Sequence, residues 1–250
     1  MFYDIPEGRH QDLQQALDTV ADIYKGQIYC SDMLVCIQKN LSFRQDQKFM
    51  SAFYESAADD QQKSLLWRLH TLAWAAKNAL LVPGDFVECG VFKGFCSEVI
   101  LKYLDFQKIP RQAYLYDTFS GLPEETSTEE ERRAWDYSSY DPETVYTEVL
   151  EKFSRYDNVY VVRGIVPHSF AEAVPDKIAF LHIDMNSVEA EMFALKHLFD
   201  KVTPGGIIVF DDFGWMCNAG QMSAELSFMN ERGHHILELP TGQGVVVKHA

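Results

Sequence analysis

Three aspartates directly follow two apolar segments of this 250-residue chain, and their type and spacing suggest a metal site. Asp184 follows residues 180–183, and the pair Asp211 and Asp212 follows residues 207–210. If both segments are parallel strands, their carboxyl ends lie at one edge of a sheet, where ligands bind. Buried carboxylates that meet there repel each other unless a cation lies between them. We therefore expect these aspartates to hold Mg²⁺, Mn²⁺ or Ca²⁺; a pair that only caps a turn is the alternative.

A glycine turn follows an earlier apolar segment, residues 86–89. The turn reads Gly90-Val91-Phe92-Lys93-Gly94, a GxxxG pattern that matches neither the dinucleotide fingerprint nor the P-loop. Phe92 stands where the dinucleotide fingerprint has the glycine that admits a pyrophosphate. A ligand with an adenosine half and no phosphate suits this turn, and S-adenosylmethionine is such a ligand. A turn that only packs a strand against a helix is the alternative.

Two further acids are placed to bind this ligand. Asp117 follows residues 113–116, roughly two dozen residues after the glycine turn, where an acid accepts hydrogen bonds from ribose hydroxyls. Glu88, at the end of the first strand, is placed to face the cationic amino-acid half. His182 lies inside an apolar segment, and we expect a hydrogen-bonded core residue there rather than a base.

The segments that carry these residues alternate between strand and helix patterns from residue 85 onward, which predicts a mostly parallel α/β sheet. The expected strands are residues 86–89, 113–116, 159–163, 178–183, 207–210, 236–239 and 245–248. The link between the last two strands is too short for a crossover helix, so we expect an antiparallel hairpin there. A parallel sheet with an antiparallel last strand resembles the class I methyltransferase arrangement more than that of dehydrogenases.

The first 82 residues differ from the rest, and we expect a helical extension there, followed by one domain of residues 83–250. Leucines and alanines between residues 65 and 80 have helical spacing, with Arg68 and Lys77 on the opposite face. The Pro83-Gly84 dipeptide then ends the helix before the first strand.

An acidic segment with aromatic residues lies between Gly121 and Thr144. It carries a run of glutamates and then Trp135, Tyr137 and Tyr140. A solvated surface loop and a mobile lid over the acceptor are both consistent with this composition.

Composition argues against several classes of partner. The formal net charge of −15 disfavours nucleic acids, whose phosphates require clustered cations. The first residues show no signal-peptide pattern, and no apolar run is long enough to span a bilayer. Five cysteines without a CxxC pair argue against zinc and against a disulfide framework. We expect a cytoplasmic protein that acts on a small molecule, with neither a nucleic acid nor a membrane as partner.

Five blocks of the sequence resemble the macrocin O-methyltransferase (TylF-type) family of class I, metal-dependent sugar O-methyltransferases. The blocks are residues 83–94, 116–123, 181–189, 204–214 and 241–244. The resemblance implies a Rossmann-like fold, S-adenosylmethionine, Mg²⁺ or Mn²⁺, and a hydroxyl of a sugar or glycosylated small molecule as acceptor. The implied cofactor-binding residues are Glu88, Gly90, Phe92, Asp117, Ser120, Gly121 and Asp184, and the implied metal ligands are Asp184, Asp211 and Asp212. Family members use N-terminal segments to cover the pocket and to pack subunits, which implies a homo-oligomer.

We expect Asp184 also to accept the proton of the acceptor hydroxyl. Family members often carry Asp-x-Asp where this chain has Asp184-Met185-Asn186, and an amide is neither a base nor a strong ligand for hard cations. Two other functions stay open: a catechol-type O-methyltransferase that acts on an aromatic diol, and a non-catalytic subunit with a methyltransferase fold.

Overall fold

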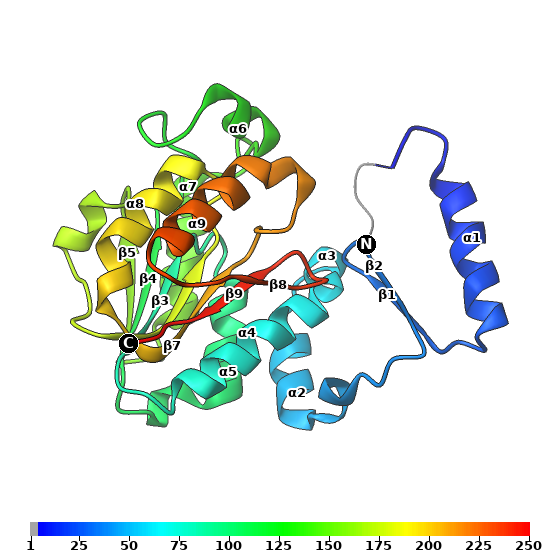
Figure 1. The fold of residues 1–250 in the computed structure, drawn as a ribbon, viewed down its shortest axis with the longest axis horizontal. Helices are drawn as coiled ribbons and strands as arrows, with labels where there is room; N and C mark the ends of the chain where they lie inside the picture. Colours follow the sequence, from blue (N-terminus) through cyan, green and yellow to red (C-terminus); the bar gives the residue numbers. More distant parts are fainter. Residues whose placement is uncertain (1–4) are drawn as a thin grey trace.

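The computed structural model describes residues 5–250, and its centre is a seven-stranded sheet (Figure 1). The strand order is β5-β4-β3-β6-β7-β9-β8. The strands are β3 (Asp85–Cys89), β4 (Ala113–Asp117), β5 (Val159–Arg163), β6 (Ile178–Ile183), β7 (Val202–Phe210), β8 (Leu237–Glu238) and β9 (Gly244–Val247). The strands from β3 to β7 pair in parallel, and β9 is antiparallel to both of its neighbours. The predicted mixed sheet with a C-terminal antiparallel hairpin is therefore confirmed.

Only β7 begins far from its expected position. It starts at Val202 and includes Pro204, Gly205 and Gly206, whose residue types are typical of a turn. Its register against β6 shifts between Ile178 and Phe180, so the strand continues through an irregular step. A sequence pattern alone does not reveal such a step.

Two cores lie on opposite faces of the sheet because alternate strand residues point to opposite sides. Phe86 and Phe180 face one core, and Val87 and Leu181 face the other. The first core contains residues of the helices α2 (Gln47–Ser56), α4 (Leu66–Ala79), α5 (Phe95–Leu104) and α7 (Pro142–Phe153), and the second contains residues of α8 (Val188–Leu198) and α9 (Ala219–Glu231). All six residues of β6 are buried, as expected for a central parallel strand.

Local chemistry explains where α7 begins. Asp141 accepts a hydrogen bond from the backbone N–H of Thr144, and Pro142 occupies the first helical position, where its missing N–H costs nothing. The remaining helices are α6 (Glu129–Ala134), α3 (Asp60–Ser64), α1 (His10–Ile23) and 3₁₀ turns at Ser42–Gln45, Phe106–Lys108, His168–Ala171, Phe199–Lys201 and Met216–Asn218. Within residues 5–250, every helix is too short or too polar to cross a lipid bilayer.

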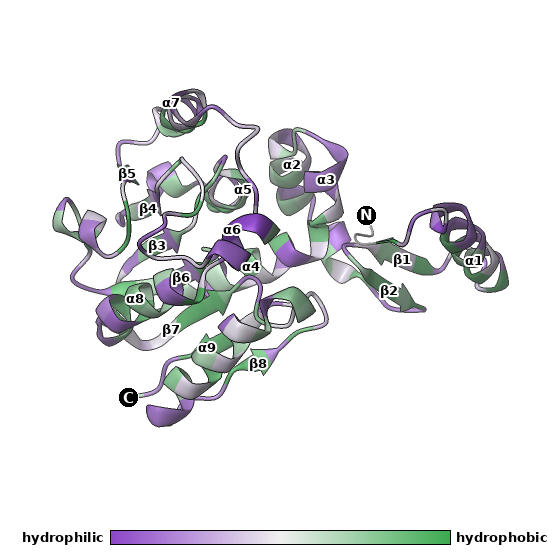
Figure 2. Ribbon diagram, turned by 90° about the horizontal axis from the view of Figure 1, so that it is seen from above, coloured by the Kyte–Doolittle hydropathy of each residue, from purple (hydrophilic) through white to green (hydrophobic). Residues whose placement is uncertain are grey.

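The N-terminal segment is not purely helical, which corrects the expectation for residues 1–82. A hairpin of β1 (Ile28–Ser31) and β2 (Leu34–Ile37) follows α1, and its two-residue turn, Asp32 and Met33, has positive φ angles of 50° and 58°. Turns of this kind match the twist of a hairpin. In two perpendicular views α1 lies apart from the body of the protein (Figures 1 and 2), and it buries none of its residues.

Helix α4 packs into the same core as the sheet, although it precedes residue 83. Leu69, Leu72 and Ala76 are fully buried there together with Phe86 and Val209. A domain boundary at residue 82 stays a prediction.

Candidate functional site

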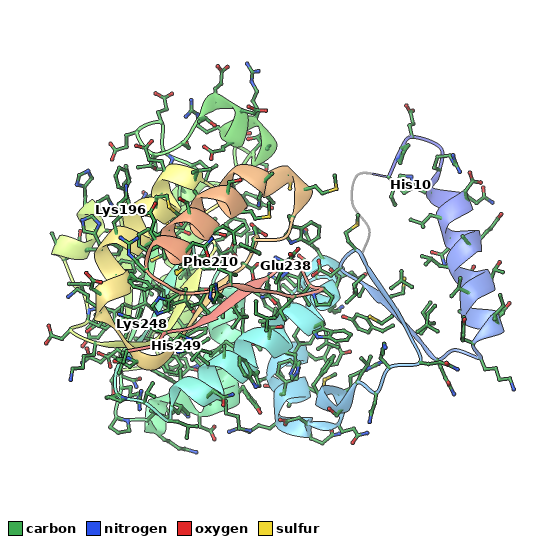
Figure 3. The ribbon with its side chains drawn as sticks, viewed as in Figure 1. His10, Lys196, Phe210, Glu238, Lys248 and His249 are labelled. Carbon is green, nitrogen blue, oxygen red and sulfur yellow. The ribbon has the colours of Figure 1, made fainter. Side chains whose placement is uncertain are left out.

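The carboxyl ends of four strands lie side by side and bring the predicted site residues together. Three backbone hydrogen bonds of 2.9 Å connect the strand ends: Gly90 donates to the Tyr116 carbonyl, Asp184 to the Cys89 carbonyl, and Asp211 to the Ile183 carbonyl. The glycine turn and the strand-end aspartates therefore share one edge of the sheet, as the sequence predicts. Phe210, the residue before Asp211, lies within the body of the protein, far from His10 on α1 (Figure 3).

The glycine turn is held by Asp117. One oxygen of its carboxylate accepts hydrogen bonds from the backbone N–H groups of Val91 and Phe92 at 2.7 and 2.8 Å, and the other accepts from Phe119 at 2.6 Å. Burial raises the pKa of Asp117, while these N–H donors act in the opposite direction. The Asp117 carboxylate thus holds the glycine turn in place. A hydrogen bond from a ribose hydroxyl would have to use the lone pairs of this carboxylate that the backbone N–H groups leave free.

Gly90 is required by a close approach of two strands. Its φ is +91°, and a Cβ atom placed on it would lie 1.7 Å from the carbonyl oxygen of Asp184. A side chain at this position would therefore separate the glycine turn from Asp184.

Glu88 lies in the layer beneath the site. Its carboxylate accepts a short hydrogen bond from the Ser97 hydroxyl through one oxygen, and the other oxygen is 2.9 Å from Nδ1 of His182. Glu88 is 4% exposed. Its position orients His182, and the predicted contact with the cationic half of a cofactor stays a prediction.

His182 is a buried, paired residue, as predicted. Its Nε2 is 3.4 Å from Oδ1 of Asp211, so the ring bridges Glu88 and Asp211. Burial acts to lower the pKa of His182, but its two carboxylate partners outweigh burial and raise the pKa to about 10. Both ring nitrogens of His182 face a carboxylate oxygen, so the ring helps to hold Asp211 in place.

Arg68 faces the strand-end aspartates, which corrects its expected position on the outer face of its helix. Its Nη1 makes a short contact with Asp211 and lies 3.3 Å from Asp212, and its Nε lies 3.3 Å from Asp32. Arg68 is 7% exposed. Its guanidinium and His182 outweigh the effect of burial and hold the pKa of Asp211 well below its usual range.

Asp184 is the strand-end acid that keeps an open carboxylate. Its side chain makes no hydrogen bond to residues 5–250, and burial together with Asp211 and Asp212 raises its pKa well above the ordinary value. Burial also raises the pKa of Asp212 to about 6, although Arg68 opposes this shift. The raised pKa values show that this edge of the sheet has more acidic side chains than basic side chains to balance them.

The donor set fits a divalent cation. Ligand atoms of His182, Asp184 and Asp211 all lie within 4.8 Å of one another, and Asp212 is next to Asp211 in sequence. Because both ring nitrogens of His182 already face carboxylates, the candidate ligands are the three aspartates, whose hard oxygens suit Mg²⁺ or Mn²⁺. The structure thus brings Asp184 and Asp211 together, and the metal-ligand set of Asp184, Asp211 and Asp212 stays a prediction.

The acidic and aromatic segment between residues 121 and 144 covers this edge of the sheet. The ring of Tyr137 lies 5.2 Å from the ring of Phe92, and a Cβ atom on Gly121 would meet Tyr137 at 3.2 Å. Helix α6 of this segment is anchored to α8, since the Val188 N–H donates to Glu131 at 2.9 Å. The segment thus lies where a lid would lie, and its mobility stays a prediction.

Asn186, the departure from Asp-x-Asp, points to this covering segment. Its Nδ2 lies 3.4 Å from the Tyr137 hydroxyl, its φ is 55°, and it is buried. The left-handed backbone suits asparagine better than most residues. Its side chain therefore contacts the cover of the site.

The structure contains a pair of buried carboxyl groups that the sequence does not predict, Glu191 on α8 and Glu225 on α9. Their exposures are 2% and 1%, and Gln221 donates to Glu191 at 2.8 Å. Burial raises the pKa of both groups, that of Glu225 to about 7. Two carboxyl groups this close share a proton at moderate pH. Each glutamate lies on a helix at a position that is typical of a polar, solvent-facing side, so the sequence alone does not predict the pair.

Replacing Glu225 by Gln is expected to raise the free energy of unfolding at pH 8 by about 1–3 kcal/mol and to change it little at pH 5. The folded protein keeps a proton that the unfolded chain releases near pH 4.5, so stability falls as pH rises from about 4.5 to about 7. Glutamine stays neutral at every pH and removes this loss.

Urea unfolding of both proteins at the two pH values measures the effect. The matched control is Glu231→Gln on the same helix, where the side chain is 70% exposed and no change is expected. An equal gain for Glu225→Gln at both pH values would contradict the shared proton.

Comparison with known protein sequences finds relatives over the region of the chain that carries the site. The sequence model described as Macrocin-O-methyltransferase (TylF) matches residues 66–236. The Mycinamicin III 3''-O-methyltransferase of Micromonospora griseorubida is 31% identical over 160 residues, which are 58% of this chain and 62% of that protein. The 8-demethyl-8-(2,3-dimethoxy-alpha-L-rhamnosyl)-tetracenomycin-C 4'-O-methyltransferase of Streptomyces olivaceus is 27% identical over 162 residues, 59% of this chain and 60% of that protein. The matched region spans about three fifths of the length of these relatives.

Comparison with solved structures shows the same fold. The O-methyltransferase NovP superposes with a TM-score of 0.62 at 22% identity, over 74% of this chain and 81% of that one. The calicheamicin methyltransferase CalS11 superposes with a TM-score of 0.56 at 19% identity, over 84% of this chain and 93% of that one. The sheet described above is thus the class I methyltransferase fold.

Proposed function

Because the chain belongs to the macrocin O-methyltransferase (TylF) family, we propose that it transfers a methyl group from S-adenosylmethionine to a hydroxyl of a sugar or glycosylated small molecule. The observation that carries this proposal is the shared strand edge, where the glycine turn at Gly90 lies directly beside the Asp184 carbonyl. Relatives named as O-methyltransferases of mycinamicin III and of a rhamnosyl-tetracenomycin support the acceptor class.

The cofactor would lie along the glycine turn. Gly90 and Phe92 have positive φ angles of 91° and 46°, which turn the chain sharply at the end of β3. Ser120 and Gly121 form the next turn, at the end of β4, and Ser120 is exposed. S-adenosylmethionine supplies a methyl group that its sulfonium already activates. The chain's own task is therefore to align an acceptor oxygen, and alignment alone contributes roughly 7–11 kcal/mol to such reactions.

Asp184, Asp211 and Asp212 would hold Mg²⁺ or Mn²⁺. A divalent ion supplies a Lewis acid that lowers the pKa of an acceptor hydroxyl. Asp211 is fixed by Arg68, by His182 and by Gln243, whose Nε2 donates to it at 2.8 Å. No residue within 5–250 donates a hydrogen bond to the Asp184 carboxylate, so this carboxylate would be free to accept the proton of the hydroxyl.

Aromatic residues would shield the reaction from water. Tyr137 and Tyr140 lie 5.2 and 5.1 Å from Phe92, ring to ring, and Lys93 lies 4.1 Å from the Tyr140 ring. Exclusion of water strengthens every electrostatic interaction in a site. A homo-oligomer and a cytoplasmic location stay predictions.

Calorimetric titration with S-adenosylhomocysteine in the presence of Mg²⁺ tests the proposal. We expect one-to-one binding with a Kd of about 1–100 μM, followed by methyl transfer to glycosides but not to catechols. Binding with transfer to catechols alone would favour an aromatic diol as acceptor. Absence of both binding and transfer would favour a non-catalytic subunit.

Asp117→Asn is expected to weaken S-adenosylhomocysteine binding about tenfold. The wild-type carboxylate uses both of its oxygens as hydrogen-bond acceptors for the turn, and an amide has only one oxygen. Calorimetry on folded protein measures the change.

The matched control for this variant is Asp85→Asn at the other end of β3. Asp85 also accepts a backbone hydrogen bond, from Gln112 at 2.9 Å, but it lies far from the strand-end site. Its replacement should leave cofactor affinity unchanged. An equal affinity for Asp117→Asn and wild type would remove Asp117 from the support of the cofactor turn.

A further inference from the structure

Arg68 lies on helix α4 and contacts the strand-end aspartates from one face of the sheet. Its guanidinium contacts Asp211 and Asp212, which the proposed function assigns to a divalent cation. The ring of Trp215 lies 5.2 Å from the guanidinium carbon. Because arginine stays protonated at every accessible pH, this positive charge is permanent.

A divalent cation and the guanidinium compete for the same oxygens. The Nη1 group lies 3.3 Å from Oδ1 of Asp212 and makes its short contact with Oδ2 of Asp211. Two cations that share these oxygens repel each other strongly, because screening is weak at buried positions. One of them must withdraw for the other to bind with full affinity.

Asp32 offers the guanidinium a second partner. It lies in the turn between β1 and β2, is 5% exposed, and already contacts Nε of Arg68 through Oδ2 at 3.3 Å. Its other oxygen, Oδ1, is buried and has no hydrogen-bond partner within residues 5–250. The free oxygen can accept an N–H group that Arg68 withdraws from Asp212.

We propose that Arg68 is a tethered counter-ion of the strand-end aspartates, which a divalent cation must displace toward Asp32 in order to bind. The proposal rests on the metal site of the proposed function. Arg68 is thus a positioning residue that sets metal affinity, and it connects the metal site to the β1–β2 hairpin through a contact that spans 36 residues of sequence.

Mn²⁺ binding to three purified variants, followed by electron paramagnetic resonance of the free ion, tests this proposal without any methyl transfer. Arg68→Gln is expected to bind Mn²⁺ about tenfold more tightly than wild type, because it removes the competing charge. Without metal, Arg68→Gln should melt at a lower temperature than wild type, and binding of Mn²⁺ should abolish this difference in melting temperature.

Two further variants make the test independent of how well Arg68→Gln folds. Asp32→Asn removes the second partner of Arg68 and is expected to weaken Mn²⁺ binding about threefold or more. Arg111→Gln is the matched control: Arg111 donates to the backbone carbonyls of Gly84 and Leu80, at the opposite end of β3, and its loss should leave Mn²⁺ affinity unchanged.

Three results would overturn the proposal. If Arg68→Gln binds Mn²⁺ no more tightly than wild type, or if Asp32→Asn binds it as tightly as wild type, Arg68 does not compete with the metal. If neither wild type nor Arg68→Gln binds Mn²⁺, no metal site exists for Arg68 to regulate. A parallel titration with S-adenosylhomocysteine separates these results from failure of the cofactor site, since that titration reports the glycine turn alone.

Discussion

Asp184→Asn is expected to lower the turnover number by about a thousandfold or more, while the protein stays folded and binds S-adenosylhomocysteine within about tenfold of wild type. An amide has the shape of the carboxylate but cannot accept a proton. Because no residue within 5–250 donates a hydrogen bond to the Asp184 carboxylate, the substitution breaks no hydrogen bond among the described residues.

The same variant is expected to be more stable than wild type at pH 8, by about 1 kcal/mol. Burial and the neighbours Asp211 and Asp212 raise the pKa of Asp184, so the folded protein holds a proton at pH values where the unfolded chain has released it. Stability is therefore lost as pH rises toward the folded pKa, and asparagine removes that loss.

Steady-state kinetics with the best acceptor, together with urea unfolding at pH 8, measures both effects. Asp200→Asn is the matched control: Asp200 is an exposed aspartate in the 3₁₀ turn Phe199–Lys201 that follows α8, where neither activity nor stability should change. Turnover by Asp184→Asn near the wild-type value would show that another group accepts the proton.

Gly90→Ala is expected to destabilise the fold by more than about 4 kcal/mol, or to prevent folding. The added methyl group would lie 1.7 Å from the Asp184 carbonyl oxygen, so β3 and β6 would have to separate at their carboxyl ends. The hydrogen bond from the Asp184 N–H to the Cys89 carbonyl lies at the same point and would be disrupted too.

Gly233→Ala separates this steric effect from the cost of the backbone conformation. Gly233 has a φ of +71°, and a Cβ atom there would meet nothing within 4 Å. We expect a loss of about 1 kcal/mol, the ordinary cost of a left-handed conformation for alanine. Urea unfolding of the two variants should show a gap of several kcal/mol between them, and similar losses would mean that the strand ends adapt to a side chain at Gly90.

Local sequence patterns predict most of the sheet. The segments 159–163 and 178–183 match β5 and β6 to the residue. The central strand β6 is buried throughout and appears in the sequence as a continuous apolar run. The exceptions are the start of β7, which passes through Pro204, Gly205 and Gly206, and the β1–β2 hairpin, whose turn lacks glycine. Both depend on pairing with other segments, which residue type does not reveal.

Spacing and position also predict which acids meet. Asp184, Asp211 and Asp212 follow their strands directly, and parallel strands end at one edge of a sheet, so their proximity follows from topology. The glycine turn and Asp117 reach the same edge for the same reason. The assignment of the metal and the cofactor to these residues stays a prediction.

What surrounds those acids depends on tertiary packing. Arg68 precedes Asp211 by 143 residues, and Glu88 lies 94 residues from His182. The residues of α4 alone predict only which of its faces is more apolar, and by that criterion Arg68 belongs outside. The sequence therefore predicts most strands of the central sheet and the acids that follow them. The folded structure alone decides which cations meet these acids, because a buried charge takes whichever opposite charge the packing of distant helices brings within reach.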